Sequence, residues 1–182
     1  KKSIDEKCYN EEKHCLYDVL GDSKVRPNQL FALSLSHPIV DNAEIAEQVL
    51  NTVENKLLNK YGLKTLSSDE DGYVDVYEGS AYRRDSSYHQ GITWPWLLGL
   101  YYDALKNTMI IEKNRTKRQE LEEKITKLVY TTKETFKAEM FERSSIGTIS
   151  DIYDSTKPYE ERGAFAQAWS VAEIFRIVLN KR

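Results

Sequence analysis

The stretch DNAEIAEQVLNTVENKLLNK, residues 41–60, decides what kind of fold this chain can have. Its apolar residues recur every three or four positions, the spacing of one face of an α-helix. Asp41 is a good N-cap, Glu44 stands in the capping-box position three residues later, and Gly62 follows as a stop. The stretch therefore predicts an amphipathic helix from Asn42 to Lys60, with one face in the core and the other in water.

A second amphipathic helix is expected from about Thr116 to Lys137. Lysine, glutamate and threonine fill most of its positions, and one apolar stripe runs along it. This stripe consists of Leu121, Ile125, Leu128, Val129 and Phe136.

Three further segments, 28–35, 94–105 and 165–179, are apolar on nearly all sides. A helix of that kind has to be covered on all sides. The order along the chain is thus buried, amphipathic, buried, amphipathic, buried, which indicates stacked αα-hairpins with inner and outer helices. Strand signals are thin and limited to Cys15–Val19 and Tyr73–Tyr77. The predicted class is all-α, as a toroid of helical hairpins or a solenoid.

Composition excludes several classes of protein. The 182 residues fit one domain, residues 1–182, and the net charge of −3 comes without a basic stripe, so no nucleic-acid partner is expected. No apolar run is long enough to cross a membrane. Cys8 and Cys15 form neither a disulfide framework nor a metal motif, which favours a reduced, cytoplasmic protein. Because the chain does not begin with Met, we expect a processed product or a piece of a longer protein.

Three connections lead into the predicted inner helices and should gather at one end of the bundle. The longest, between Gly62 and Trp94, is rich in tyrosines and acids, and compact domains rarely keep such a loop without a use. A pocket that combines aromatic rings with carboxylates, an arginine and a histidine suits a carbohydrate, since sugar C–H faces stack on rings while hydroxyls need polar partners. The alternative is that the tryptophans belong to the core and the acids are solvated.

Four blocks in order along the chain carry a resemblance: RPNQLFA at 26–32, YHQGITWPWL at 88–97, GTISDIYD at 147–154 and AQAWSVAE at 166–173. Together they resemble the C-terminal part of the bacterial and archaeal glycogen debranching enzymes, the amylo-α-1,6-glucosidase family. The resemblance runs from about Leu16 to Leu179. It implies roughly half of an (α/α)6 barrel, and hydrolysis of α-1,6-linked glucose in glycogen or a branched α-glucan, with inversion and without metal or organic cofactor.

The resemblance also implies site residues. Asp151 matches the family's general base, which is a glutamate, and the shorter side chain would place its oxygen roughly 1–1.5 Å farther from the water; a misplacement of about 1 Å can cost a hundredfold. The family's general acid lies upstream of every block matched here, so this chain alone is expected to be inactive. The sugar contacts implied are Arg26, Gln29, Tyr88, His89, Trp94, Trp96, Gln167 and Trp169.

Two other hypotheses remain open. A non-catalytic glycan-binding or helical interaction module would explain both the aspartate at 151 and the missing acid. A solenoid adaptor would require a repeat, and none is found. Since half a barrel would leave inner helices such as 165–179 with one apolar side uncovered, we also expect self-association or contact with a missing N-terminal part of the same polypeptide.

Overall fold

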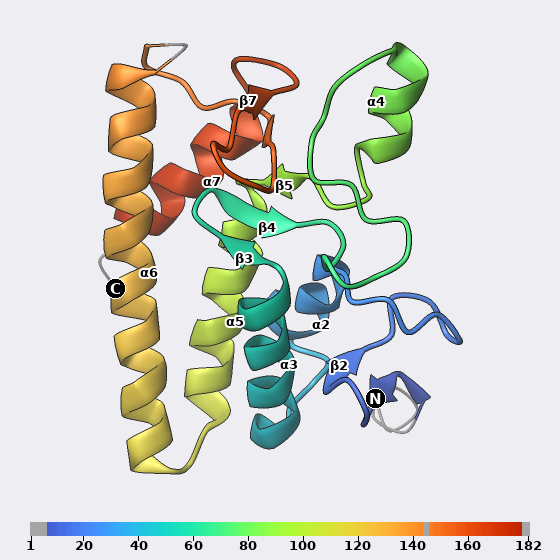
Figure 1. Ribbon diagram of the computed structural model, residues 1–182. Helices are drawn as coiled ribbons and strands as arrows, with labels where there is room; N and C mark the ends of the chain where they lie inside the picture. The colour runs from blue at the N-terminus through green and yellow to red at the C-terminus, as the bar shows by residue number, and fades with distance from the viewer. Residues whose placement is uncertain (1–6, 144–145, 180–182) are drawn as a thin grey trace.

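The computed structural model describes residues 7–143 and 146–179 and shows a mixed fold of helices and antiparallel strands (Figure 1). The all-α class is therefore wrong. The helices are η1 (Pro27–Leu30), α2 (Phe31–Ser34), α3 (Ala43–Lys56), α4 (Ala81–Ser87), α5 (Leu97–Ile111), α6 (Arg115–Glu142) and α7 (Ala168–Leu179). The strands are β1 (Tyr9–Asn10), β2 (Cys15–Leu16), β3 (Leu58–Asn59), β4 (Gly62–Lys64), β5 (Thr93–Trp94), β6 (Ile152–Tyr153) and β7 (Glu161–Arg162).

Helix α5 forms the centre of the fold. It packs against α2, α3, α6 and α7, and in Figure 1 it lies between α6 and α3. Leu97, Leu98, Tyr101, Ala104 and Leu105 are all buried. The expectation that this apolar helix is covered on all sides is thus confirmed, although it begins at Leu97 rather than at Trp94.

Helix α3 has the predicted amphipathic pattern but different ends. Its N-cap is Asn42, whose side chain accepts hydrogen bonds from the backbone N–H groups of Glu44 and Ile45. The helix ends at Lys56 because the chain then turns into the β3–β4 hairpin, where Leu58 pairs with Leu63. Gly62 belongs to this hairpin: a Cβ there would lie within 2.3 Å of the Trp94 carbonyl oxygen, so only glycine lets the neighbouring strand approach.

The larger sheet has five antiparallel strands in the order β3-β4-β5-β6-β7, which is also their order along the chain. Along the chain, helix α4 connects β4 to β5, and helices α5 and α6 connect β5 to β6. Each strand has two or three residues, too few for an apolar–polar alternation to be visible in the sequence. This sheet joins the ends of segments that were expected to be purely helical, so the half-barrel of helical hairpins is not supported.

The structure also corrects two other expectations, for segments 28–35 and 73–77. The apolar segment 28–35 forms a 3₁₀ turn followed by the four-residue α2, not a full inner helix. Of the two suspected strands, Cys15–Leu16 is one, whereas 73–77 is an irregular segment held by single backbone hydrogen bonds such as Val74 N–H to the Gln90 carbonyl.

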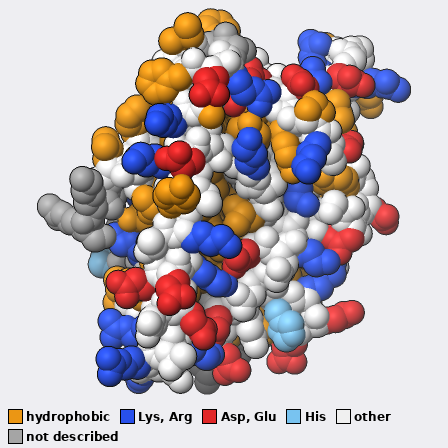
Figure 2. All heavy atoms as spheres, turned by 60° about the vertical axis from the view of Figure 1, so that its left-hand side comes forward, with side chains coloured by type: hydrophobic (Ala, Val, Ile, Leu, Met, Phe, Trp, Pro, Cys, Tyr) orange, Lys and Arg blue, Asp and Glu red, His pale blue; other side chains and the backbone are white. Residues whose placement is uncertain are grey.

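Helix α7 is only partly covered. Ile174 and Ile177 are buried, but Trp169, Phe175 and Leu179 are 46%, 43% and 66% exposed. The surface view shows further hydrophobic side chains among the charged ones on the face where α6 comes forward (Figure 2). The chain therefore leaves an apolar stripe of α7 in contact with solvent.

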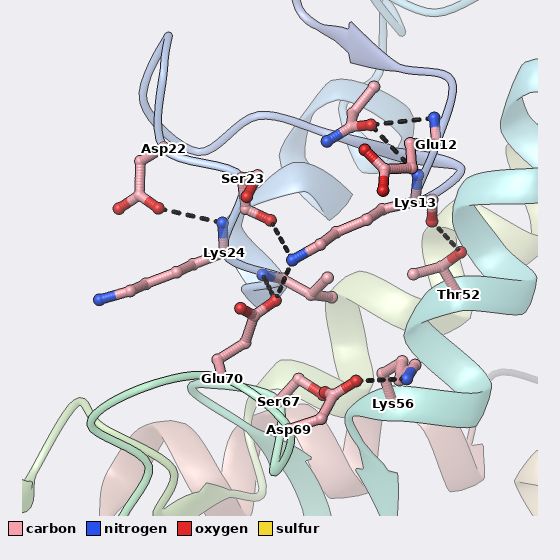
Figure 3. A network of polar contacts seen from close by, with 12 residues as sticks. Glu12, Lys13, Asp22, Ser23, Lys24, Thr52, Lys56, Ser67, Asp69 and Glu70 are labelled. Atoms are coloured by element: carbon pink, nitrogen blue, oxygen red, sulfur yellow. Dashed lines mark hydrogen bonds and ion pairs between the residues drawn. The ribbon is translucent and has the colours of Figure 1, made fainter.

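Polar contacts tie the long connection after β4 to the rest of the chain (Figure 3). Glu70 accepts hydrogen bonds from Lys13 Nζ at 2.7 Å and from Val25 N–H at 3.1 Å. Asp69 pairs with Lys56 at the end of α3, and the hydrogen bonds from Lys56 and Ser67 lower the pKa of Asp69 to about 2. The connection is thus anchored at its start, although it contains little regular structure.

Candidate active site

Asp151 is a buried carboxylate just before β6, only 3% exposed. Its Oδ2 accepts a hydrogen bond from the Tyr88 hydroxyl at 2.5 Å. Its Oδ1 accepts hydrogen bonds from Gln167 Nε2 and Trp169 Nε1, both at 3.3 Å. Three of the residues that the resemblance places in the site therefore meet at the predicted base, and they come from segments far apart in the sequence.

The backbone around Asp151 is held in place from both sides. Asp151 N–H donates to the Ala164 carbonyl at 2.9 Å, and Gln167 N–H donates to the Ile149 carbonyl at 3.0 Å. Gly163 has a φ of +69°, and a Cβ at this position would lie 2.9 Å from Asp151 Oδ2. A glycine is needed here because the conformation is left-handed and the carboxylate lies too close for any side chain.

A pocket of about 780 Å³ opens beside this carboxylate. That volume falls within the range of small-molecule sites. The pocket is lined by Tyr77, Glu78, Gly79, Arg84, Tyr88, Asp151, Arg162, Gly163, Ala164 and Gln167. Its walls are mostly polar, so it suits a ligand with many hydroxyl groups better than an apolar one.

Asp154 shapes the far wall of this pocket. It is buried, and its Oδ2 accepts hydrogen bonds from Arg162 Nε at 3.0 Å and Nη2 at 2.8 Å, while Oδ1 accepts one from Tyr77 N–H at 2.8 Å. Two donors of one guanidinium thus share a single carboxylate oxygen, which holds the Arg162 side chain against Asp154. The arginine was visible in the sequence only as part of a polar loop, and nothing there indicated that Asp154 would hold it.

A chain of aromatic rings leads away from Asp151. The rings of Tyr88 and Trp94 are 4.7 Å apart, those of His89 and Trp94 5.2 Å, and Trp169 lies 5.9 Å from Trp94 and 5.8 Å from Trp96. We call these five residues the aromatic wall. Trp94 is fixed in the wall because its Nε1–H donates to the Tyr88 carbonyl at 3.2 Å.

The other side of the aromatic wall faces a second pocket of about 500 Å³, lined in part by Arg26, His89, Trp94 and Trp96. Arg26 donates to the carbonyls of Thr65 at 3.1 Å and His89 at 2.8 Å, and to the Gln90 side chain at 3.0 Å. The structure thus distributes the proposed sugar contacts over two pockets, with Trp169 touching groups that line each.

Gln29 lies apart from both pockets. Its Oε1 accepts a hydrogen bond from Leu16 N–H at 3.1 Å and its Nε2 donates to the Arg26 carbonyl at 2.8 Å, and the side chain is buried. Both ends of the amide are therefore engaged with backbone.

Two pKa shifts set the protonation of the aromatic wall. Burial and the hydrogen bond to Asp151 raise the pKa of Tyr88 well above its usual value, which keeps its hydroxyl a donor. Burial and the nearby Arg26 guanidinium lower the pKa of His89, so the ring is neutral at pH 7. The Asp151 carboxylate thus faces a neutral hydrogen-bond donor in Tyr88.

Among residues 7–143 and 146–179, no group of three or more His, Cys, Asp or Glu side chains is placed to hold a metal ion. None of the helices described in these ranges has the length and apolar character needed to cross a membrane.

A buried carboxylate in a polar pocket beside aromatic rings is the kind of site that glycoside hydrolases use. The particular family follows from comparison with known families: the family described as amylo-alpha-1,6-glucosidase matches residues 1–176 of the 182. The chain belongs to this family. Membership makes it a glycogen-debranching type of chain and indicates a glucan as its substrate class.

Proposed function

We propose that this chain carries the general-base half of an α-1,6-glucosidase site and that Asp151 is the base. In an inverting reaction, Asp151 would take a proton from a water whose oxygen attacks the anomeric carbon. A carboxylic acid opposite would protonate the departing glycosidic oxygen. We propose that the acid is not among the residues of this chain, which is why we expect the chain alone to be inactive.

The observation that carries the proposal is the hydrogen bonding of Asp151. A carboxylate offers about four acceptor positions. Tyr88, Gln167 and Trp169 use three of them, which leaves one for a water in the pocket. Such fixed donors keep the carboxylate in one orientation, as a base that must align a single water requires.

The aromatic wall supports the proposed substrate. Trp169 is about half exposed, so a glucosyl ring can stack on it, whereas Trp94 is buried behind it and holds the wall in place. We propose Arg26, His89 and the amide of Gln167 as contacts for sugar hydroxyls and the ring of Trp96 as an apolar contact, with Gln29 acting through its support of the Arg26 backbone. No cofactor is required for this chemistry.

A cytoplasmic location belongs to the same proposal. Cys8 and Cys15 are both free thiols in the structure. Free cysteines are typical of the reducing cytosol.

Titration with a branched or linear maltooligosaccharide tests the proposal in the chain as it stands. We expect saturable binding that changes tryptophan fluorescence, because Trp94, Trp96 and Trp169 lie in or beside the two pockets. Cellooligosaccharides of the same length are the control and should bind more weakly. The absence of any saturable change with the α-glucan would contradict the proposal.

One observation favours the second candidate, a glycan-binding module without catalysis. Within the part of the chain that the structure describes, the other carboxylate lining the pocket is the exposed Glu78, beside the Arg162 guanidinium. The acid of a glycosidase is a carboxyl group held in apolar surroundings, and the exposed Glu78 lacks them. Binding without glucose release by the complete protein would select this candidate.

We also propose that the exposed stripe of α7 contacts the remainder of the polypeptide or a second copy. An apolar groove of about 240 Å³ between α6 and α7 supports this, with Phe136, Met140, Phe141 and Phe175 among its lining residues. Light scattering of the isolated chain should show an average mass that rises with concentration. A monomer at every concentration would count against the second copy and leave only the remainder of the polypeptide.

A further inference from the structure

A second carboxyl cluster lies behind the β6–β7 hairpin, outside the pocket. Glu139 of α6 is only 4% exposed. Its Oε1 accepts a hydrogen bond from the Tyr153 hydroxyl at 3.0 Å. Its Oε2 is buried and receives no hydrogen bond from any donor in the described part of the chain. A buried carboxylate oxygen without a donor is costly unless it carries a proton.

The nearby cation, Arg143, forms only a long ion pair with this group and shorter contacts elsewhere. Arg143 directs its Nε to Glu161 Oε1 at 2.8 Å and its Nη1 to the Tyr61 hydroxyl at 2.8 Å. The closest approach of Arg143 to Glu139 is 3.6 Å, beyond hydrogen-bond distance. One guanidinium therefore faces two carboxyl groups and binds the one on β7.

The other groups described around the cluster are two phenols and one lysine. Tyr153 and Tyr61 are phenols whose rings stack 4.4 Å apart, and Lys60 lies over the outer face of Tyr61 with its Nζ 4.9 Å from the ring centroid. Burial and the Glu139 carboxyl keep the pKa of Tyr153 far above neutral. These surroundings thus stabilise one negative charge on the two carboxyl groups of Glu139 and Glu161, but not a second one.

We propose that Glu139 and Glu161 share one proton, and that this carboxyl pair is a positioning device for the β6–β7 hairpin and, through it, for Asp151. Tyr153 of β6 and Glu161 of β7 face each other as a cross-strand pair. The cluster therefore contacts both strands of the hairpin at the same position. Asp151 directly precedes β6, and Gly163 directly follows β7. The strands held from behind by Glu139 are the ones whose ends form the base side of the pocket.

The electrostatics of the cluster agree with this geometry. Burial, together with the Glu161 carboxyl, raises the pKa of Glu139 to about 7, from about 4.3 in an unfolded chain. Between the unfolded and the folded pKa, the folded protein holds this proton and the unfolded chain does not. The free energy of unfolding therefore falls as the pH rises from the unfolded pKa to the folded one. Between pH 6 and pH 8 the expected loss is about tenfold in the ratio of folded to unfolded protein.

The test is the Glu139→Gln variant, which keeps the shape and cannot ionise. Its amide can accept from Tyr153 and donate to Glu161 at every pH. We expect denaturant unfolding to show wild type losing about tenfold in the folding equilibrium from pH 6 to pH 8, with this loss absent in Glu139→Gln. Glu134→Gln makes the same change at an exposed position of α6 and should behave like wild type.

A second readout separates positioning from general stability. At pH 8, amide exchange in residues 150–163 should be slower in Glu139→Gln than in wild type, with exchange in α3 unchanged. Equal pH dependence of unfolding in wild type and Glu139→Gln would overturn the proposal. So would equal exchange in that segment.

If Glu139→Gln fails to fold, the same pH dependence of unfolding is measured in Glu161→Gln, which changes the more exposed partner of the pair. Removing the like charge should reduce the loss of stability above pH 6, and an unchanged loss would overturn the proposal. None of these measurements uses a glucan, so they stand or fall independently of the proposed catalytic function.

Discussion

Replacing Asp151 by asparagine is expected to lower glucose release from a branched glucan by about 100- to 10,000-fold in the complete protein, since a general base contributes that much. The amide keeps the shape of the side chain and can still accept a hydrogen bond, but it cannot take a proton from water. The amide oxygen can take the place of Oδ1 and keep the hydrogen bond from the Trp169 indole, while its NH2 group takes the place of Oδ2 and donates to the Tyr88 hydroxyl, which can turn to accept. Binding of a maltooligosaccharide should therefore change less than threefold, about 0.6 kcal/mol.

Asp85→Asn is the matched control, because Asp85 is exposed on α4 and does not line the pocket. It should leave both glucose release and binding unchanged. Full activity in Asp151→Asn would remove Asp151 from the mechanism. Asp151→Glu is informative as well, because glutamate is the base that the family resemblance implies: a gain in activity would show that the shorter side chain limits the reaction.

Replacing Trp169 by alanine is expected to weaken maltooligosaccharide binding by about tenfold or more, near 1.4 kcal/mol. The indole is about half exposed, donates a hydrogen bond to Asp151 and contacts the rings of Trp94 and Trp96. Because so much of the ring already contacts solvent, its loss should destabilise the fold less than removal of a buried ring. Calorimetric titration measures the affinity without relying on the fluorescence of the residue removed.

Two further variants locate the cause of that loss. Trp169→Phe keeps a ring for stacking but loses the N–H that donates to Asp151, so binding should be largely retained while glucose release falls. Tyr130→Ala removes a ring that is 65% exposed on α6 and should change neither property. An affinity that is the same in Trp169→Ala and wild type would place the sugar elsewhere.

The long helices α3, α5 and α6 could be predicted from the sequence because their signals are long. The stripe of α3, including Val49, Leu50 and Val53, is buried as its spacing indicates, and so is Phe136 of α6. The sheet could not be predicted, because two-residue strands carry no period of their own. Gly62 was interpreted as the end of a helix, yet its reason is the close approach of the Trp94 carbonyl, a contact between segments more than 30 residues apart.

The candidate site was predictable to the extent that a resemblance to a family assigns residues. Tyr88, Gln167 and Trp169 were named as sugar contacts, and the structure brings all three to Asp151 as hydrogen-bond donors. Gln29 was named in the same way and instead bonds to backbone. The support of the Arg162 wall by Asp154 depends on how β6 and β7 pair, which no local pattern in the sequence encodes.

The most direct measurement is a crystal structure of the Asp151→Asn variant with a branched maltooligosaccharide bound. We expect a glucosyl unit in the pocket beside residue 151, with one ordered water between that side chain and the anomeric carbon and a sugar ring stacked on Trp169. A glucan bound away from this pocket, or an anomeric carbon too far from residue 151 for one water to bridge, would contradict the assignment of Asp151 as the base.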